Sequence, residues 1–240
     1  MEIFVVLAWI VGMLIIATVS AVLAKKFGPE ILVGMFAGAV VITAVIANKI
    51  VVFGPFTLSA SIIVFSITFF FTDILSEFWG KKKAQKAVWA GFLADVLLLF
   101  ALWVAIQWEP ASFWQNQEAF AKTLGQAPRI VAASLGGYVV AQNYDVWAYH
   151  FLKRKTNGKH LWIRNLASTG SSQIIDSVIF ATVAFLGKAP VLPVILSTIV
   201  VKYIIAALDT PFIYAVRWYY EKVPPKKKSK KVEEGVVAVD

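Results

Sequence analysis

The sequence predicts an all-α membrane protein, a polytopic bundle of seven transmembrane helices. Hydrophobic residues make up 59% of the 240 residues, charged residues only 15%, and the mean hydropathy is +0.74. Soluble domains are about 45–50% apolar and about 25% charged. The apolar runs are long and continuous, whereas membrane-spanning strands alternate apolar and polar residues over about 10 positions. The composition therefore excludes a water-soluble domain, and the runs favour helices over strands.

Seven segments are long and apolar enough to cross about 30 Å of hydrocarbon, which takes about 20 residues in a helix. The first, residues 3–24, carries no charge and is followed by two lysines. It is too long for the core of a signal peptide, and the lysines stand where a cleavage site would need small residues. The others are residues 31–48, 56–79, 87–108, 130–152, 166–187 and 191–220. Pro29, Pro55 and Pro190 stand at or just before three of the starts, where a missing N–H costs nothing.

The loops differ in positive charge, which predicts the orientation. Eighteen of the 23 Lys and Arg residues lie in alternate loops and beside the C-terminus, four lie in the opposite loops, and Lys202 lies inside a span. Because positive charge marks the cytoplasmic side, we expect the C-terminus in the cytoplasm and the N-terminus outside the plasma membrane. We attribute the net charge of +9 to this distribution of loop cations. Because the basic residues do not cluster on the surface of a soluble domain, we expect no nucleic-acid partner.

Two segments lie outside the apolar runs. Residues 109–128 carry Phe113, Trp114, Phe120 and Leu124 among polar residues, which predicts either a helix resting on the outer leaflet or a lid over a cavity. Residues 222–240 contain the run PPKKKSKK. They are expected to form a disordered basic tail in contact with anionic membrane lipids.

Ionisable side chains inside the spans indicate function, because lipid offers them no partner. The polar side chains inside the spans, all ionisable except the two glutamines, are Asp73, Glu77, Asp95, Gln142, Asp145, Gln173, Asp176, Lys202 and Asp209. Gln173 and Asp176 are three residues apart and therefore share a helix face. Lys202 is the single cation at midplane depth, so we expect an ion pair with Asp176 and an interior cavity lined by the other acids.

Structural roles are the alternative for several of these acids. Asp73 and Glu77 could cap the inner end of their span and pair with Lys81 or Lys86. Asp145 could pair with a loop cation such as Arg154, and Asp95 could sit neutral against a neighbouring helix.

The sequence lacks the residues that several kinds of chemistry require. The chain has no cysteine and two histidines, so we expect no metal site and no cofactor. It has neither an HExxH motif nor a Ser-His pairing, so we expect no enzyme, and without a GxxxxGK[ST] stretch it does not hydrolyse ATP through a P-loop. A non-transporting accessory protein would make little use of so many intramembrane acids. A transporter is therefore favoured. Its energy source could be an ion gradient or an external energising module, or the substrate could equilibrate passively. A homo-oligomer is compatible with the sequence.

The run FTDILSEFWGKKKAQKAVWAGF, residues 71–92, resembles the signature of the queuosine precursor transporter family. This family belongs to the vitamin uptake transporters, whose fold is likened to the substrate-binding subunits of energy-coupling-factor transporters. The resemblance continues through RIVAASLGGYVVAQNYDVWAYHFLK (129–153), LWIRNLASTGSSQIIDSVIFATVAF (161–185), Lys202 and DTPFIY (209–214). Asn48 matches an asparagine near the end of the family's first core helix. One departure is FSITFFFTD, where the family often has Phe-Pro before the Thr-Asp pair.

The resemblance implies a six-helix core over residues 29–221, preceded by an extra helix in residues 1–28. It implies import of 7-cyano-7-deazaguanine or 7-aminomethyl-7-deazaguanine, the precursors of queuosine, with another small heterocycle or vitamin as the alternative. A carboxylate suits the ring N–H and the exocyclic amine of such a molecule. We expect substrate contacts from Asp176, Gln173, Asp145, Arg129, Gln142, Lys202 and Asn48. We expect gating or coupling roles for Asp73, Glu77 and Asp209.

Overall fold

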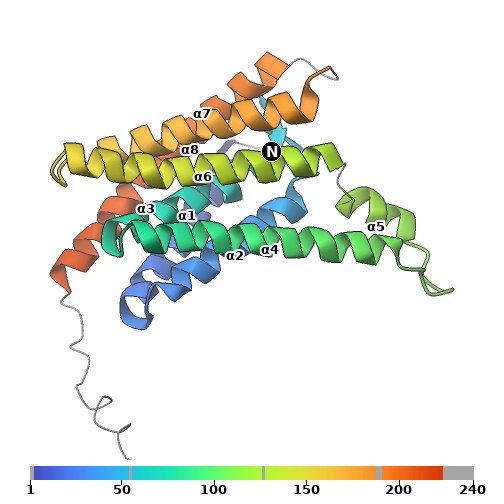
Figure 1. Cartoon of the computed structure of the whole chain (residues 1–240), viewed down its shortest axis with the longest axis horizontal. Coiled ribbons are helices and arrows are strands. Elements are labelled where there is room, and N and C mark those ends of the chain that lie inside the picture. The colour runs from blue at the N-terminus through green and yellow to red at the C-terminus, as the bar shows by residue number, and fades with distance from the viewer. Residues whose placement is uncertain (1–2, 54–55, 126–127, 188–190, 224–240) are drawn as a thin grey trace, which may run out of the picture.

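The computed structural model describes residues 3–53, 56–125, 128–187 and 191–223, and this part of the chain is almost entirely helical (Figure 1). Its helices are α1 (Ile3–Phe27), α2 (Glu30–Ile46), α3 (Ile62–Phe78), α4 (Lys81–Gln107), α5 (Gln117–Leu124), α6 (Pro128–Lys155), α7 (Leu161–Phe185) and α8 (Val191–Lys222). Two short strands, β1 (Ile50–Phe53) and β2 (Phe56–Ser59), form an antiparallel hairpin. All but the first two residues of the expected tail, 222–240, lie outside the described residues.

The seven long helices run back and forth between the two ends of one bundle (Figure 1). Each corresponds to a predicted span, although α4 and α7 begin earlier than expected, at Lys81 and Leu161. Three of them, α1, α4 and α8, are long and apolar enough by themselves to cross a membrane. The 17-residue α2 and α3 are shorter, and α6 and α7 carry many polar residues. Membrane crossing by all seven helices therefore stays a prediction.

The predicted start of the third span at Phe56 is wrong. Residues 56–59 form β2, which pairs with β1 in the register Ile50↔Ser59 and Val52↔Thr57, and α3 begins only at Ile62. The sequence IVVF of β1 is rich in β-branched residues, which favour strands. The sequence FTLS of β2 alternates apolar and polar residues, which is the strand pattern, but it directly precedes the apolar run of α3, and composition alone extends the span over it.

Helix α3 occupies the centre of the bundle, and nearly all its side chains from Ile62 to Ser76 are buried. It packs against α1, α2, α4, α6 and α8, while α7 packs along α6 and against α8. Side chains of α1, α2, α3 and α4 form most of an apolar core, to which α6 and α8 also contribute. Between α3, α6, α7 and α8 the interior is polar instead. The polar half of the interior is where a site has to lie.

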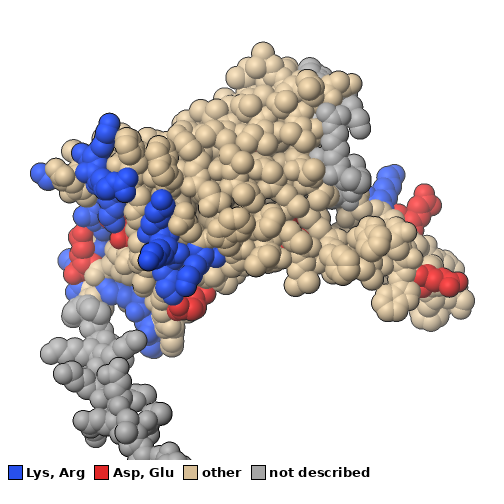
Figure 2. Space-filling view, viewed as in Figure 1, with Lys and Arg blue, Asp and Glu red and all other residues tan. Residues whose placement is uncertain are grey.

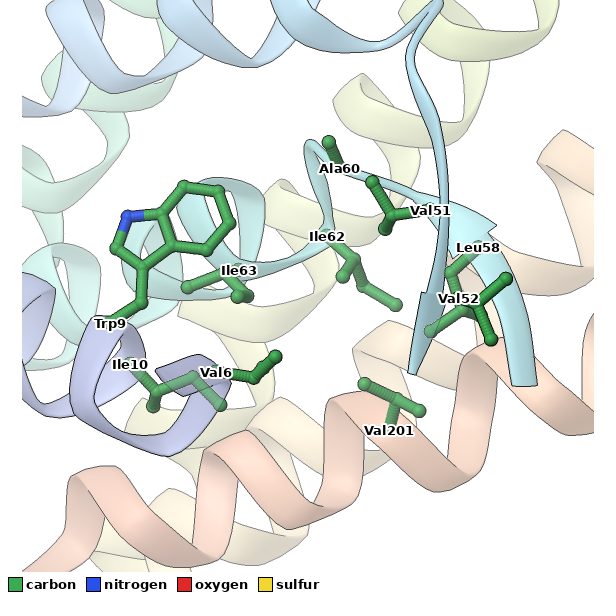
Figure 3. Close-up of a pocket in the computed structure, with 10 residues that line it drawn as sticks. All are labelled: Val6, Trp9, Ile10, Val51, Val52, Leu58, Ala60, Ile62, Ile63 and Val201. Carbon is green, nitrogen blue, oxygen red and sulfur yellow. The ribbon is translucent and has the colours of Figure 1, made fainter. Parts of the chain in front are cut away.

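The hairpin and α1 enclose a small apolar cavity of about 40 Å³ (Figure 3). Trp9 and Ile10 of α1, Val52 and Leu58 of the hairpin and Val201 of α8 are among its lining residues. The lining has no polar group other than the indole of Trp9. A water molecule needs polar partners as well as room, so this cavity is a packing defect of an apolar region.

Lys and Arg side chains gather at one end of the bundle, and the middle of the visible face carries almost no charge (Figure 2). We call this the basic end; it is formed by Lys25, Lys26, Lys81, Lys82, Lys83, Lys86, Lys153, Arg154, Lys155, Lys159, Arg217 and Lys222. In the middle, α4 presents Leu93, Leu97, Phe100 and Trp103, each more than 60% exposed. Such a belt of exposed apolar side chains suits contact with lipid.

Helix α5 lies beyond the opposite end, next to the end of α4 (Figure 1). The prediction of a helix within residues 109–128 is confirmed for Gln117–Leu124, which has no buried residue. Gln117 donates a hydrogen bond to the carbonyl of Ile106, and Asn48 donates one to the carbonyl of Thr123, at 2.8 Å each. These two bonds attach α5 to the ends of α4 and α2.

Helix α1 is joined to the last helix at the basic end. Lys25 Nζ donates to the carbonyl oxygens of Tyr220 at 2.6 Å and Tyr219 at 3.3 Å, and the Tyr220 hydroxyl donates to the carbonyl of Ala21 at 2.8 Å. A cation is favourable at the C-terminal end of a helix, where carbonyls lack partners. The packed face of α1 is marked by Ile10, Leu14, Ala17, Ala21 and Ala24. The division into residues 1–28 and a separate core stays a prediction.

Candidate functional site: a buried polar core between four helices

Polar residues recur every four positions along α7, in two neighbouring stripes. The first stripe is Arg164, Ser168, Ser172 and Asp176, and the second is Asn165, Thr169, Gln173 and Ser177. None of the eight is more than 7% exposed. Residues four apart lie on one face of a helix, so both stripes point into the bundle. There they meet polar side chains of α3, α6 and α8.

A buried ion pair joins α7 to α8. Lys202 Nζ lies 2.6 Å from Asp176 Oδ2 and 3.5 Å from Ser177 Oγ, and it stands 4.8 Å from the ring centre of Phe65. The predicted pairing of Lys202 with Asp176 is confirmed. On the other side, α6 approaches closely at Gly137, where an added Cβ would lie 2.9 Å from Asp176 Oδ1. The carboxylate is therefore held between a cation and the backbone of α6.

Two buried amides, one on α7 and one on α6, are incompletely bonded. Gln173, one turn before Asp176, is 1% exposed, and neither its Oε1 nor its Nε2 has a hydrogen-bond partner. Gln142 of α6 donates from Nε2 to Thr68 Oγ1 at 2.7 Å, while its Oε1 has no partner. A buried polar group without a partner costs about 1–3 kcal/mol. Gln173 thus offers a donor and an acceptor side by side to a molecule with a matching edge.

Three further acids lie deeper in the core and are held by neutral donors. Asp145 accepts from Ser172 Oγ at 3.1 Å and from Thr72 Oγ1 at 3.4 Å. Asp73 accepts from Thr169 Oγ1 at 3.3 Å, and Asp209 accepts from Asn165 Nδ2 at 2.9 Å. Among the described residues, none of the three acids has a Lys or Arg within 4.0 Å. The alternative in which Asp145 pairs with Arg154 is wrong, because Asp145 is fully buried between α3 and α7.

Glu77 stands near the basic end in a cluster of cations from three helices. Arg164 Nη2 lies 3.0 Å from both of its oxygens, Lys153 Nζ lies at 2.8 Å and Arg217 Nη1 at 3.8 Å. The Tyr149 hydroxyl donates to it at 2.9 Å. We call these five residues the Glu77 cluster; it joins α3, α6, α7 and α8. The alternative in which Glu77 pairs with Lys81 or Lys86 is wrong, because the converging helices α6, α7 and α8 supply nearer cations.

Arg164 is the residue of this core that the sequence interpretation missed. It was counted among the loop cations because the predicted span began at residue 166, whereas α7 begins at Leu161. Its side chain is fully buried and lies over the ring of Tyr149, 5.5 Å from the ring centre. The four-residue spacing from Arg164 to Ser168 and Ser172 is the signal that places it on the polar face of α7.

Two expected or considered residues, Asn48 and Asp95, lie elsewhere. Asn48 bonds to the carbonyl of Thr123 and is not brought to the polar core. Arg129 belongs to the first turn of α6, but its side chain lies outside the described part of the structure. Asp95 is buried on α4, apart from the polar stripes of α7.

Comparison with known proteins shows the family of this chain. Residues 59–216 match the model of a family described as "Putative vitamin uptake transporter". The chain belongs to this family. One similar protein, from Bacillus subtilis (strain 168), is described as "Probable queuosine precursor transporter". It is 35% identical over 159 residues, which are 65% of this chain and 69% of the relative. The resemblance found in the sequence is therefore confirmed.

As a vitamin uptake transporter, the protein is a membrane transporter and not an enzyme. The matched residues 59–216 include α3, α6, α7 and most of α8, and so nearly all of the buried polar core. Helices α1 and α2 precede the matched segment. No solved structure matches the chain, so the expected likeness to the substrate-binding subunits of energy-coupling-factor transporters stays a prediction.

Proposed function

We propose that this transporter imports 7-deazaguanine precursors of queuosine, 7-cyano-7-deazaguanine or its aminomethyl relative. The description of the Bacillus subtilis relative names queuosine precursors and supports this substrate class. The structural observation that carries the proposal is the buried, unpartnered amide of Gln173 one turn from the Lys202–Asp176 pair. A carboxylate, an ammonium and an amide at one place form a set of groups that complements the polar edge of a guanine-like ring.

The proposed contacts follow from donor and acceptor chemistry. Asp176 accepts the ring N–H and the exocyclic amine of the substrate, and Gln173 Nε2 donates to the ring carbonyl. An ionised carboxylate has about four lone-pair positions, so that Asp176 accepts both groups while it keeps Lys202. Gln142 offers its unpartnered Oε1 from the facing helix α6. In this proposal Asp145 lies at the inner side of the site and Arg129 at its outer entrance.

The Glu77 cluster is proposed as the gate on the cytoplasmic side, with Asp73 and Asp209 between it and the substrate. Its contacts tie together α3, α6, α7 and α8 at the basic end. Substrate that leaves toward the basic end has to pass between helices that these ion pairs hold together. Opening on this side therefore requires at least some of the contacts of Glu77 to break.

The test of the substrate is binding of 7-cyano-7-deazaguanine to the purified Asp176→Asn variant in detergent. Loss of a charge-assisted hydrogen bond costs about 1.5–3 kcal/mol, or about 10- to 150-fold in affinity. Asp95→Asn is the matched control, since Asp95 is an equally buried acid on α4, outside the polar core. Wild-type affinity in Asp176→Asn contradicts the proposed site. Competition of uptake by adenine, guanine and vitamins separates the deazaguanines from another heterocycle.

The orientation is tested separately. We propose seven crossings, with the N-terminus outside and the basic end in the cytoplasm, because Lys and Arg gather at that end (Figure 2). Alkaline phosphatase fused at the C-terminus is expected to be inactive, and the same reporter placed at residue 112, between α4 and α5, is expected to be active. A C-terminus on the outer side would contradict the orientation and the number of crossings together.

A further inference from the structure

The middle of the polar core contains acids without cations. Asp145 faces Thr72 and Asp73 from α3, Ser168, Thr169 and Ser172 from α7, and Asp209 from α8. Within the described residues, no Lys or Arg nitrogen lies within 4.0 Å of Asp145, Asp73 or Asp209. Tyr149 follows one turn later on α6, and its hydroxyl is bonded to Glu77. Lys202 is bonded to Asp176, and Arg164 to Glu77. An isolated buried carboxylate is so costly that such groups neutralise instead.

The hydroxyl groups around Asp145 have a second acceptor each. Ser172 Oγ lies 2.9 Å from the carbonyl oxygen of Thr169 and 3.1 Å from Asp145 Oδ1. Thr72 Oγ1 lies 2.9 Å from the carbonyl oxygen of Phe69 and 3.4 Å from Asp145 Oδ2. Each hydroxyl has one proton and two lone pairs, and in both cases the backbone carbonyl is the nearer acceptor.

Asp145 therefore has a hydrogen-bonded arrangement in each protonation state. When its carboxyl is ionised, the hydroxyls of Ser172 and Thr72 turn toward it. When it is protonated, the acid donates its own proton to one hydroxyl oxygen, and that hydroxyl turns to its backbone carbonyl, while the other hydroxyl keeps donating to the second oxygen of the acid. A group that loads and releases a proton during a transport cycle needs this property, because neither state then leaves a buried polar group without a partner.

The neighbouring Asp73 gives the proton a way onward. Asp73 Oδ1 is buried and has no hydrogen-bond partner, while its other oxygen accepts from Thr169. Asp73 precedes Glu77 by one turn of α3, and so lies between Asp145 and the basic end.

We infer that import is coupled to the inward movement of a proton, and that Asp145 carries this proton. A proton from the outer water binds the Asp145 carboxylate and gives the neutral acid; on the cytoplasmic side it leaves to water, by way of Asp73, and restores the carboxylate. No bond of the substrate changes. The inference rests on the proposed function, since it concerns the same site.

The proposed proton site and the proposed substrate site lie on the same two helices, α6 and α7, and this couples them. Asp145 lies one turn from Gln142 on α6, and its partner Ser172 directly precedes Gln173 on α7. A change in the bonds of Asp145 therefore acts on the residues proposed to hold the substrate. Because such coupling is reciprocal, protonation of Asp145 raises the affinity for substrate, and substrate raises the affinity for the proton.

The test uses purified full-length protein in liposomes with 7-cyano-7-deazaguanine, which has no titrating group near neutral pH. A gradient that makes the lumen alkaline is expected to drive accumulation of the ligand, and a trapped pH dye is expected to report acidification of the lumen during uptake. In detergent, the wild-type Kd should rise with pH by up to about tenfold per unit. Asp145→Asn imitates the protonated acid, so that its Kd should not change with pH.

In the same liposomes, Asp145→Asn should exchange labelled for unlabelled ligand but lose accumulation, whereas the control Asp95→Asn should keep accumulation. Wild-type uptake without acidification, accumulation by Asp145→Asn, or accumulation driven by a sodium gradient instead would each overturn the inference. If Asp145→Asn is not folded by size-exclusion chromatography, the dye measurement on the wild type decides. Folded wild-type protein that binds no deazaguanine contradicts the proposed substrate first, and the inference with it.

Discussion

The two buried ion-pair regions of this transporter differ in how many partners surround the carboxylate. Glu77 has three cations and a tyrosine hydroxyl around one carboxylate, from three helices. Asp176 has one cation, Lys202, and next to it stands the amide of Gln173 without any partner. In the Glu77 cluster, Arg164 Nε and Nη1 also lack a hydrogen-bond partner, whereas at Gln173 both ends of an amide do. Buried groups without partners are typical of functional sites. From the number of partners we expect the Glu77 cluster to hold the helices together and the Asp176 region to bind substrate.

The comparison is tested most strongly by Glu77→Ala. This change leaves the fully buried Arg164 without its carboxylate, and removing one partner of a buried pair costs about 3–5 kcal/mol. The free energy of unfolding in detergent measures the loss. Glu221→Ala is the control: it removes the exposed partner of Arg217, where about 0–1 kcal/mol is expected. Equal effects of the two changes would mean that the Glu77 cluster does not hold the helices together.

Lys202→Ala is expected to have the next largest effect, about 3 kcal/mol, because it leaves Asp176 without a cation. The double variant Lys202→Ala with Asp176→Asn replaces the unpaired charge by a neutral amide and should recover stability without recovering transport. Unfolding and uptake are measured on the same preparations. A double variant less stable than either single variant shows that the two residues do not act as a pair.

Gln173→Leu is expected to change stability least and in the opposite direction. It removes an amide that has no partner, so the free energy of unfolding should rise by about 1 kcal/mol, while the affinity for 7-cyano-7-deazaguanine falls. Gln142→Leu is the matched control, since its amide is bonded to Thr68 and its loss should destabilise the protein. If Gln173→Leu lowers stability and leaves affinity unchanged, Gln173 has a structural role only.

The sequence predicts those features of the molecule that depend on local spacing. The long helices follow from apolar runs, and the Lys202–Asp176 pair follows from a single deep cation opposite a polar helix face. The partners of Glu77 do not follow, because many cations lie at or near the basic end, and the crossing of the helices decides that Lys153, Arg217 and the buried Arg164 meet it. The hairpin does not follow from composition, because the four residues FTLS of β2 adjoin the long apolar run of α3, and their alternation of apolar and polar residues is too short to stand out.

The bonds between Lys25 and the end of α8 have a consequence for biogenesis. They join residues 194 and 195 positions apart, and the bond from Tyr220 to Ala21 spans 199. During synthesis α1 enters the membrane first, yet its partner carbonyls exist only after α8 has left the ribosome. Until then α1 has to wait beside α2 and α3, with the cation at its end facing water. The seam between α1 and α8 is therefore among the last contacts to form during assembly.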